Sequence, residues 1–209
     1  MRRLIVNADD LGFTAGINRG ILEAHEGGIV TSTSLMVDRP GAEEGAEIAR
    51  RTPSLSVGLH AVLDHNDELI VTAVMCDAEL GRQLDRYQQL VGGRPTHIDS
   101  HHHTHRDPRI HDVFVAFADR QALPMREHSV RHEAGYYGEH AIGVDSLLEI
   151  LGGLEEGDTE LGCHPGYVEA LESRYSAPRE REIESLTDPR VRERLGELGI
   201  ELIGWKEIA

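Results

Sequence analysis

Strand-like runs and helical stretches with one apolar face alternate along this chain. The segments with the pattern of strands are residues 4–6, 32–37, 55–59, 96–105, 123–126, 159–163 and 200–203. Between them, apolar residues recur at i, i+4 and i+7, the spacing of one helix face. The predicted helices are the segment between Thr14 and Gly27, residues 40–51, 78–91, the segment that begins at Asp107-Pro108, residues 147–154, and the segment between Asp188 and Gly199. Residues 61–75 and 128–142 have little periodicity, whereas residues 167–186 are charged and predicted to be partly helical.

Two of these helices carry clear boundary signals. Thr14 precedes the first helix and is a good N-cap residue, and Gly27-Gly28 stops that helix. Asp188 caps the last helix, with Pro189 at its first position.

The alternation of strand and helix predicts the fold class. It implies parallel strands joined by right-handed crossovers, because consecutive parallel strands need a long connection. About seven such units fit into residues 1–209 without a linker or an internal repeat. We therefore expect one α/β domain, a distorted or incomplete (β/α) barrel of about seven parallel strands. A doubly wound open sheet is the alternative.

Composition narrows the class of partner and the compartment. The chain has 209 residues and a formal charge of −16, which argues against nucleic acid as a partner. The two cysteines, Cys76 and Cys163, form no CxxC motif, so a zinc ribbon is excluded. Neither a signal peptide nor an apolar span of 18 residues is evident. A cytoplasmic protein with reduced thiols and no membrane span is the expectation.

The stretch from Thr96 to His105 is the most unusual part of the sequence. It holds five of the thirteen histidines, and imidazole is a common ligand for divalent metals. In a strand, alternate side chains share a face. The residues that would then line one face are His97, Asp99, His101, His103 and His105. A solvated histidine-rich loop is the simpler alternative.

Polar residues also follow most of the other predicted strands. These residues are Asp9, Asp10, His60, His101, Arg126 and His164. The carboxyl ends of parallel strands form one face of the sheet, so these side chains should converge although they are distant in sequence. Each has a structural alternative on its own: the aspartates could cap a helix, His60 could be a satisfied strand-end residue, and His164-Pro165-Gly166 could be a turn. Cys163 is expected in the core, and no G-x-S-x-G motif supports a serine nucleophile.

Two histidines and a carboxylate would suit a catalytic metal ion. Such a set leaves coordination positions open for water, and the metal lowers the pKa of that water and polarises a carbonyl oxygen. A second carboxylate could accept the proton, and a histidine across the site could protonate the leaving group. These parts fit the hydrolysis of an amide or ester, without identifying the acyl group.

Five motifs resemble those of a known family, in its order and through nearly the whole chain. They are N-A-D-D-L-G at 7–12, T-S-T-S-L-M at 31–36, G-L-H at 58–60, P-T-H-I-D-S-H-H-H-T-H at 95–105 and C-H-P-G-Y at 163–167. They resemble the YdjC-like carbohydrate deacetylases, which include the ChbG and HpnK types. The resemblance implies a barrel related to the NodB-type deacetylases. It also implies a hydrolase of carbohydrate metabolism that removes acetyl from an N-acetylated sugar.

The resemblance also implies roles for individual residues. Asp9 resembles the general base, His164 the general acid, and Arg126 the arginine that orients the base. The implied metal ligands are Asp10, His60 and His101, with Mg²⁺ expected from the family and Zn²⁺ also compatible with two imidazoles. His97, Asp99, His103 and His105 become supporting or substrate-side candidates, because a metal-bound histidine needs its other nitrogen fixed.

Some features depart from the family pattern. Leu11 stands where phenylalanine is usual, Ala61 replaces a larger aliphatic residue, and the segment between His60 and Thr96 is shorter than in the chitooligosaccharide enzymes. The exact substrate therefore does not transfer with the resemblance. The partner is expected to be a small N-acetylated carbohydrate, and a homodimer is compatible with the family. Two other hypotheses remain open: an amidohydrolase acting on a non-sugar acyl amide, and a histidine-rich metal-binding protein without turnover.

Overall fold

The computed structural model describes residues 1–65, 68–168 and 176–208. Its strands are β1 (Arg2–Leu11), β2 (Ser32–Leu35), β3 (Ser56–Ala61), β4 (Asp64–His65), β5 (Glu68–Leu69), β6 (Ile98–Ser100), β7 (Arg131–Glu133), β8 (Gly157–Cys163) and β9 (Ile200–Leu202). The α-helices are α1 (Ala15–Glu26), α2 (Ala42–Arg51), α3 (Ala73–Val91), α4 (His111–Gln121), α5 (Val144–Gly153), α6 (Ser176–Thr187) and α7 (Pro189–Leu198). Two short 3₁₀ helices, η1 (His101–Arg106) and η2 (Trp205–Glu207), complete the described secondary structure.

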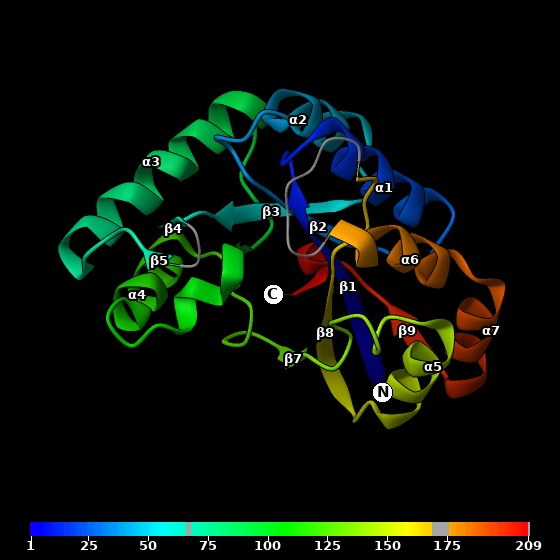
Figure 1. The fold of residues 1–209 in the computed structure, drawn as a ribbon. Coiled ribbons are helices and arrows are strands. Elements are labelled where there is room, and N and C mark those ends of the chain that lie inside the picture. The colour runs from blue at the N-terminus through cyan, green and yellow to red at the C-terminus, as the bar shows by residue number, and fades with distance from the viewer. Residues whose placement is uncertain (66–67, 169–175, 209) are drawn as a thin grey trace.

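Seven of the strands form one parallel sheet in the order β6-β3-β2-β1-β8-β7, with β9 paired to the start of β1. Isolated parallel bridges, Ile98 with Met125 and Arg126 with Val130, continue the pairing beyond β6. The helices lie around the outside of this curved sheet (Figure 1), in the packing order α4, α3, α2, α1 and α6. The fold is therefore a parallel half-barrel, and the predicted distorted (β/α) barrel is confirmed.

The local signals act as predicted at both ends of the chain. The Thr14 side chain accepts a hydrogen bond from the Ile17 amide at the start of α1, and Asp188 does the same for Arg190 at the start of α7. Buried Ile17 and Ile21 turn one face of α1 toward β1, whose residues from Leu4 to Leu11 are all buried. A strand buried on both faces is what a parallel sheet covered by helices requires.

The carboxyl end of β1 departs from regular strand geometry. The register between β1 and β2 shifts between Ala8 and Leu11, and Asp10 has a left-handed backbone with φ of 72°. Gly12 follows with φ of 86°, and a Cβ there would lie 2.9 Å from both Leu35 and the Met36 carbonyl oxygen. Such an irregularity re-aims side chains. It explains how two adjacent aspartates, which would point to opposite faces of a regular strand, both reach the same edge of the sheet.

Several predicted boundaries were wrong. The stretch 96–105 is not a single strand: β6 ends at Ser100, and residues 101–106 form η1. The Ser100 hydroxyl accepts the His105 amide at 2.9 Å, which favours a tight turn over a continued strand. Residues 123–126 contribute only bridges, and β7 lies within 128–142, where no strand was predicted. Helix α3 begins at Ala73 and not at Ala78, and part of the 167–186 prediction lies outside the described residues.

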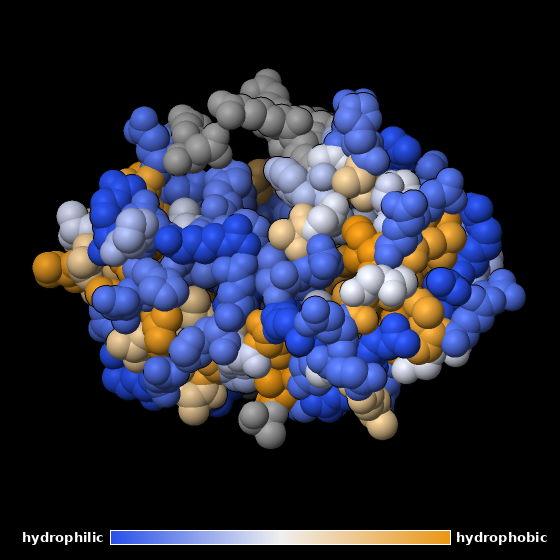
Figure 2. Space-filling model, turned by 90° about the horizontal axis from the view of Figure 1, so that it is seen from below, coloured by the Kyte–Doolittle hydropathy of each residue, from blue (hydrophilic) through white to orange (hydrophobic). Residues whose placement is uncertain are grey.

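One face of the molecule is mostly hydrophilic. Figure 2 shows a face on which hydrophilic residues predominate and apolar residues form separate patches. Among the residues that the structure describes, no helix is long and apolar enough to cross a membrane.

Candidate active site at the carboxyl edge of the sheet

Arg126 forms the centre of a buried ion cluster at this edge. Its guanidinium holds Asp9 with two hydrogen bonds, Nη1 to Oδ2 at 2.7 Å and Nη2 to Oδ1 at 2.6 Å. The same group contacts Glu160 of β8 at 2.9 Å and Asp99 of β6 at 2.9 Å. All four side chains are at most 5 % exposed. One arginine therefore joins three strands of the half-barrel through their carboxylates.

Asp9 is held as an anion in one orientation. Burial alone would raise the pKa of Asp9, but Arg126 outweighs burial and holds it well below its usual range. Asn7 donates a further hydrogen bond to Asp9 Oδ1 at 2.8 Å. The proximity of Arg126 and Asp9, suggested by the sequence, is thus present in the structure.

His60 lies between two carboxylates. Its Nδ1 is 2.7 Å from Asp99 Oδ1, and its Nε2 is 3.3 Å from Asp10 Oδ1. The Ser34 hydroxyl donates to the other oxygen of Asp99 at 2.8 Å, which fixes that carboxylate. Because a carboxylate only accepts hydrogen bonds, the contact with Asp99 places a proton on His60 Nδ1. The other ring nitrogen, Nε2, faces Asp10.

Asp10 has one satisfied oxygen and one unsatisfied oxygen. Arg179 of α6 donates to Oδ2 at 2.6 Å, whereas buried Oδ1 has no hydrogen-bond donor among the described residues. Burial raises the pKa of Asp10, but Arg179 and His60 outweigh it and hold the pKa well below its usual range. With His60 neutral, Asp10 Oδ1 and His60 Nε2 would be two acceptors 3.3 Å apart, so the pair needs either a second proton on the imidazole or a metal ion between the two atoms.

The field around His60 agrees with that need. Burial opposes a charge on the imidazole, but Asp99, Asp10 and Asp9 outweigh burial and raise the pKa of His60 to about 10. A field that stabilises an imidazolium also stabilises a divalent cation at the same place.

His101 begins η1 directly after β6 and faces His60. The two rings are edge-on, with centroids 5.8 Å apart. Its Nδ1 lies 3.2 Å from Asp64 Oδ1, while His102 Nδ1 lies 2.8 Å from Asp64 Oδ2. Burial raises the pKa of Asp64, but the two histidines outweigh it and lower the pKa. His101, like His60, thus has a carboxylate at Nδ1, which leaves Nε2 for a ligand.

His164 approaches the cluster from the loop after β8. Its Nε2 is 3.9 Å from Asp9 Oδ2, and burial, the largest cause, lowers the pKa of His164 to about 4. The loop packs closely on α1, because a Cβ at Gly20 would lie 2.5 Å from Gly166 Cα. Tyr137, 60 % exposed, lies edge-on to His164 with ring centroids 5.7 Å apart.

The structure separates the histidines that the alternating pattern placed on one face. His97 is fully buried and stacks on Trp205 with centroids 4.8 Å apart, away from His101. His103 and His105 pack edge-on at 5.7 Å, and the Ser100 hydroxyl contacts His105 Nδ1 at 2.7 Å. The predicted common face was wrong because His102 and His103 have left-handed φ values of 50° and 51°. Asp99 and His101 are the members of this group that lie beside His60.

His97 predicts a measurable pH dependence of stability. Burial, the largest cause, lowers its pKa from 6.5 to about 4. Between these values the unfolded chain binds a proton that the folded chain does not, so stability falls as the pH falls. We expect His97→Gln to remove about 2 kcal/mol of the stability lost between about pH 7.5 and pH 4.5. Urea unfolding at both pH values measures this. His128→Gln, at a half-exposed site, should retain the wild-type dependence, and equal pH dependence in both variants would contradict the assignment.

Some residues of the cluster were missed in the sequence. Glu160 is a charged residue within a buried strand, a pattern that could have indicated a buried ion pair. Asp64 lies in the segment without clear periodicity, and Arg179 lies among many charged residues of α6. Neither position carries a local signal that distinguishes it from a solvated side chain.

Two groups of side chains in the described part of the chain have ligand atoms close enough to share a metal ion. They are Asp64, His101 and His102, and Asp9, His60 and Asp99. Neither is the set expected from the sequence, but each contains one of its histidines, His101 or His60. In both groups, contacts to the carboxylates use the Nδ1 atoms of the histidines. In the expected set of Asp10, His60 and His101, the Nδ1 atom of each histidine already faces a carboxylate outside the set, Asp99 or Asp64.

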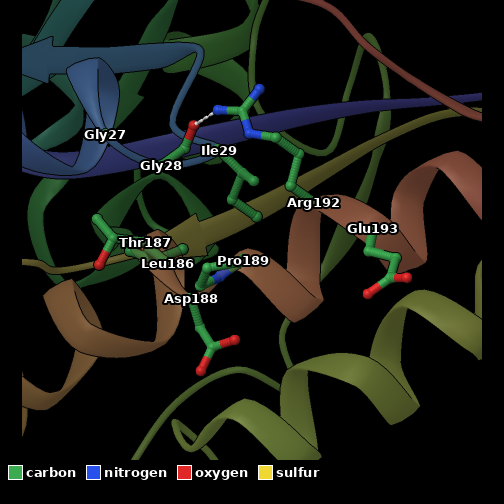
Figure 3. A pocket seen from close by; sticks show the side chains of 9 residues that line it. All are labelled: Gly27, Gly28, Ile29, Leu186, Thr187, Asp188, Pro189, Arg192 and Glu193. Carbon is green, nitrogen blue, oxygen red and sulfur yellow. Dashed lines mark hydrogen bonds between the residues drawn. The ribbon is translucent and has the colours of Figure 1, made fainter.

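A separate hollow of about 410 Å³ lies near the opposite edge of the sheet (Figure 3). It is lined by Gly27, Gly28, Ile29, Leu186, Thr187, Asp188, Pro189, Arg192 and Glu193. Ile29 precedes β2, so this hollow lies at the amino end of that strand. Arg192 donates to the Gly28 carbonyl oxygen across it. The hollow is therefore distinct from the cluster around Arg126.

The parallel half-barrel is similar in fold to solved carbohydrate esterases and deacetylases. The structure superposes on the family 4 carbohydrate esterase from Streptomyces lividans with a TM-score of 0.65 and 11 % identity, covering 99 % of this chain and 95 % of that one. A structure from Enterococcus faecalis V583, described in terms of cellobiose-phosphate cleavage, gives a TM-score of 0.89 at 29 % identity over 100 % and 99 % of the two chains.

The chain belongs to the YdjC-like family, whose model matches residues 3–197. A chitooligosaccharide deacetylase of Serratia marcescens is 35 % identical over 98 % of both chains. A carbohydrate deacetylase of Geobacillus stearothermophilus is 35 % identical over 99 % of this chain and 98 % of its own. The first alignment extends over 249 positions, although this chain has only 209 residues, so the relative contains additional segments.

Proposed function

We propose that this protein is a metal-dependent carbohydrate deacetylase. It hydrolyses the acetamide of an N-acetylated amino sugar, or of a small oligosaccharide, to acetate and the free amine. The observation that carries the proposal is the facing pair Asp10 Oδ1 and His60 Nε2, 3.3 Å apart beside the buried Asp9. The relatives named as chitooligosaccharide and carbohydrate deacetylases support a sugar substrate.

Asp10, His60 and His101 would hold the metal ion. Their fit rests on the unsatisfied Asp10 oxygen and on the two carboxylates, Asp99 and Asp64, that occupy the Nδ1 atoms of the histidines. A divalent ion there supplies Lewis acidity, which polarises a carbonyl oxygen and makes water more acidic. Mg²⁺ is the ion expected from the family, and two imidazoles also suit Zn²⁺.

Asp9 is the proposed proton acceptor. Arg126 keeps it ionised and fixes both oxygens, so an acceptor is present throughout the neutral pH range. The attacking water gives its proton to Asp9 as its oxygen bonds to the acetyl carbon. A fixed acceptor reduces the entropy cost of that step.

His164 is the proposed proton donor to the departing nitrogen. With its pKa lowered to about 4, it is neutral in the free protein, so it has to take up a proton before it can give one. Nε2 lies 3.9 Å from Asp9 Oδ2, which places it next to the group that receives the proton of water. Protonation of the nitrogen then accompanies cleavage of the C–N bond, and acetate and the amine are released.

Acetate release tests the proposal. Purified protein, stripped with a chelator and reloaded separately with Mg²⁺, Zn²⁺ or Co²⁺, is incubated with N-acetylglucosamine and its oligomers. We expect acetate from at least one sugar, its loss on stripping and its return with one metal. A parallel panel of non-sugar acyl amides provides the contrast. Activity on that panel alone, or full activity of the stripped protein, would overturn the proposal.

A further inference from the structure

Helix α6 contacts the candidate site at two places, Asp10 and the loop of His164, through two buried charged residues. Arg179 and Glu182 are three positions apart and therefore lie on one helix face. They are 4 % and 0 % exposed. Ionised side chains at such depth are costly unless they are paired, so their contacts indicate what they stabilise.

Arg179 joins the metal side of the site to the loop of His164. Nη2 donates to Asp10 Oδ2 at 2.6 Å, and Nη1 donates to the His164 carbonyl oxygen at 3.3 Å. The carbonyl oxygen of Arg179 also accepts the Gly166 amide at 3.4 Å. With Oδ2 held by Arg179, Oδ1 is the oxygen that Asp10 turns toward His60, 3.3 Å from Nε2. The guanidinium thus selects which oxygen of Asp10 is available.

Glu182 holds the loop that carries His164. Its Oε2 accepts the His164 backbone amide at 2.5 Å, so the backbone of His164 is held by α6 at both its N–H and its C=O. The backbone of His164 determines where its imidazole ring lies. The 3.9 Å separation between His164 Nε2 and Asp9 therefore depends on this backbone.

We propose that Arg179 and Glu182 are a positioning pair, in which Arg179 orients Asp10 for a divalent cation and Glu182 orients His164 for proton transfer. The inference rests on the proposed function. Neither residue contacts the reacting atoms. Arg179 sets the geometry of Asp10, which is more than 100 positions away in the sequence, and Glu182 sets that of the nearby loop that carries His164. The two residues differ in the property that each controls, which makes them separable by experiment.

For Arg179, the readout is Mn²⁺ affinity, measured by calorimetric titration of the stripped full-length protein. Loss of a group that orients a metal ligand typically weakens binding by about 10–100-fold. We expect Arg179→Met to show a weakening of this size and Arg179→Lys to recover part of it. Arg181→Gln is the matched control, because Arg181 is an exposed residue of the same helix that donates to the Glu139 carbonyl oxygen. Unchanged or tighter Mn²⁺ binding in folded Arg179→Met and Arg179→Lys would overturn this half.

For Glu182, both kcat for acetate release and Mn²⁺ affinity are measured, because only kcat should change. We expect Glu182→Leu to lower kcat about tenfold or more while its Mn²⁺ affinity stays within about twofold of wild type. Glu182→Gln retains an acceptor for the His164 amide and should restore most of kcat. Equal kcat in wild type and folded Glu182→Leu would overturn this half, as would equal losses in the Leu and Gln variants. If wild type releases no acetate but Arg179→Met still loses Mn²⁺ affinity, the proposed function fails and the role of Arg179 stands.

Discussion

Asp9→Asn should lower acetate release by about 10²–10⁴-fold, the usual contribution of a positioned acid or base. The amide of asparagine is nearly isosteric with the carboxylate but cannot accept the proton of water. Arg126 keeps Asp99 at 2.9 Å and Glu160 at 2.9 Å as partners, so the guanidinium remains paired in the variant. Metal content should be unchanged, because Asp9 is not among the proposed ligands. Initial rates with a saturating oligosaccharide, together with metal analysis of the same sample, measure both expectations.

Glu160→Gln is the matched control for this variant. It also removes one carboxylate from Arg126. The other neighbour of Glu160 is His132, whose Nδ1 lies 3.5 Å from Glu160 Oε2, and neither residue has a proposed part in the reaction. Both variants should lose stability in urea unfolding, since each weakens a buried ion cluster. Only Asp9→Asn should lose activity by two orders of magnitude or more. Unchanged acetate release in Asp9→Asn would exclude Asp9 as the proton acceptor.

His60→Ala should abolish binding of the principal metal ion and, with it, activity. The substitution removes Nε2, which faces Asp10 at 3.3 Å, and leaves Asp99 without its imidazole partner. We expect the metal content to fall from about one ion per chain to nearly none, and metal-dependent thermal stabilisation to disappear. Elemental analysis and melting with and without metal provide two independent measurements.

His102→Ala separates the two possible metal groups. His102 is paired with Asp64 at 2.8 Å and is not among the proposed ligands. We expect this variant to retain the ion, with His101 still held by Asp64. If His102→Ala loses the ion and His60→Ala keeps it, the ion binds at Asp64, His101 and His102, and the proposed site is wrong. Several ions per chain in both variants would favour the histidine-rich metal-binding protein without turnover.

Local sequence signals predicted the elements that local chemistry controls. Thr14 and Asp188 begin helices because a side-chain oxygen close in sequence satisfies a free amide at the helix start. The strand containing Leu4–Val6 was found because its apolar run is buried on both faces. Its end was misplaced, because Asp9 and Asp10 continue β1 through an irregular register that depends on the pairing with β2.

The histidine stretch shows where periodicity fails. A period of two places His101, His103 and His105 together only if the strand continues. The Ser100 hydroxyl instead bonds to the His105 amide, and the chain turns into η1. That competition between a side chain and the strand is not visible in the apolar pattern. Of the five candidates on the supposed face, Asp99 and His101 lie beside His60.

The sequence by itself determined the order of strands and helices, and therefore which chain segments end at the carboxyl edge of the sheet. Parallel connections bring those ends together whatever the details of packing, so the meeting of Asp9, Asp10, His60 and His164 was predictable. Only the tertiary structure decided which atom of each side chain faces the others. Arg179 reaches Asp10 across 169 positions, and Arg126 reaches Asp9 across 117. Such contacts have no sequence period, because they depend on how helices and loops pack after the sheet has formed.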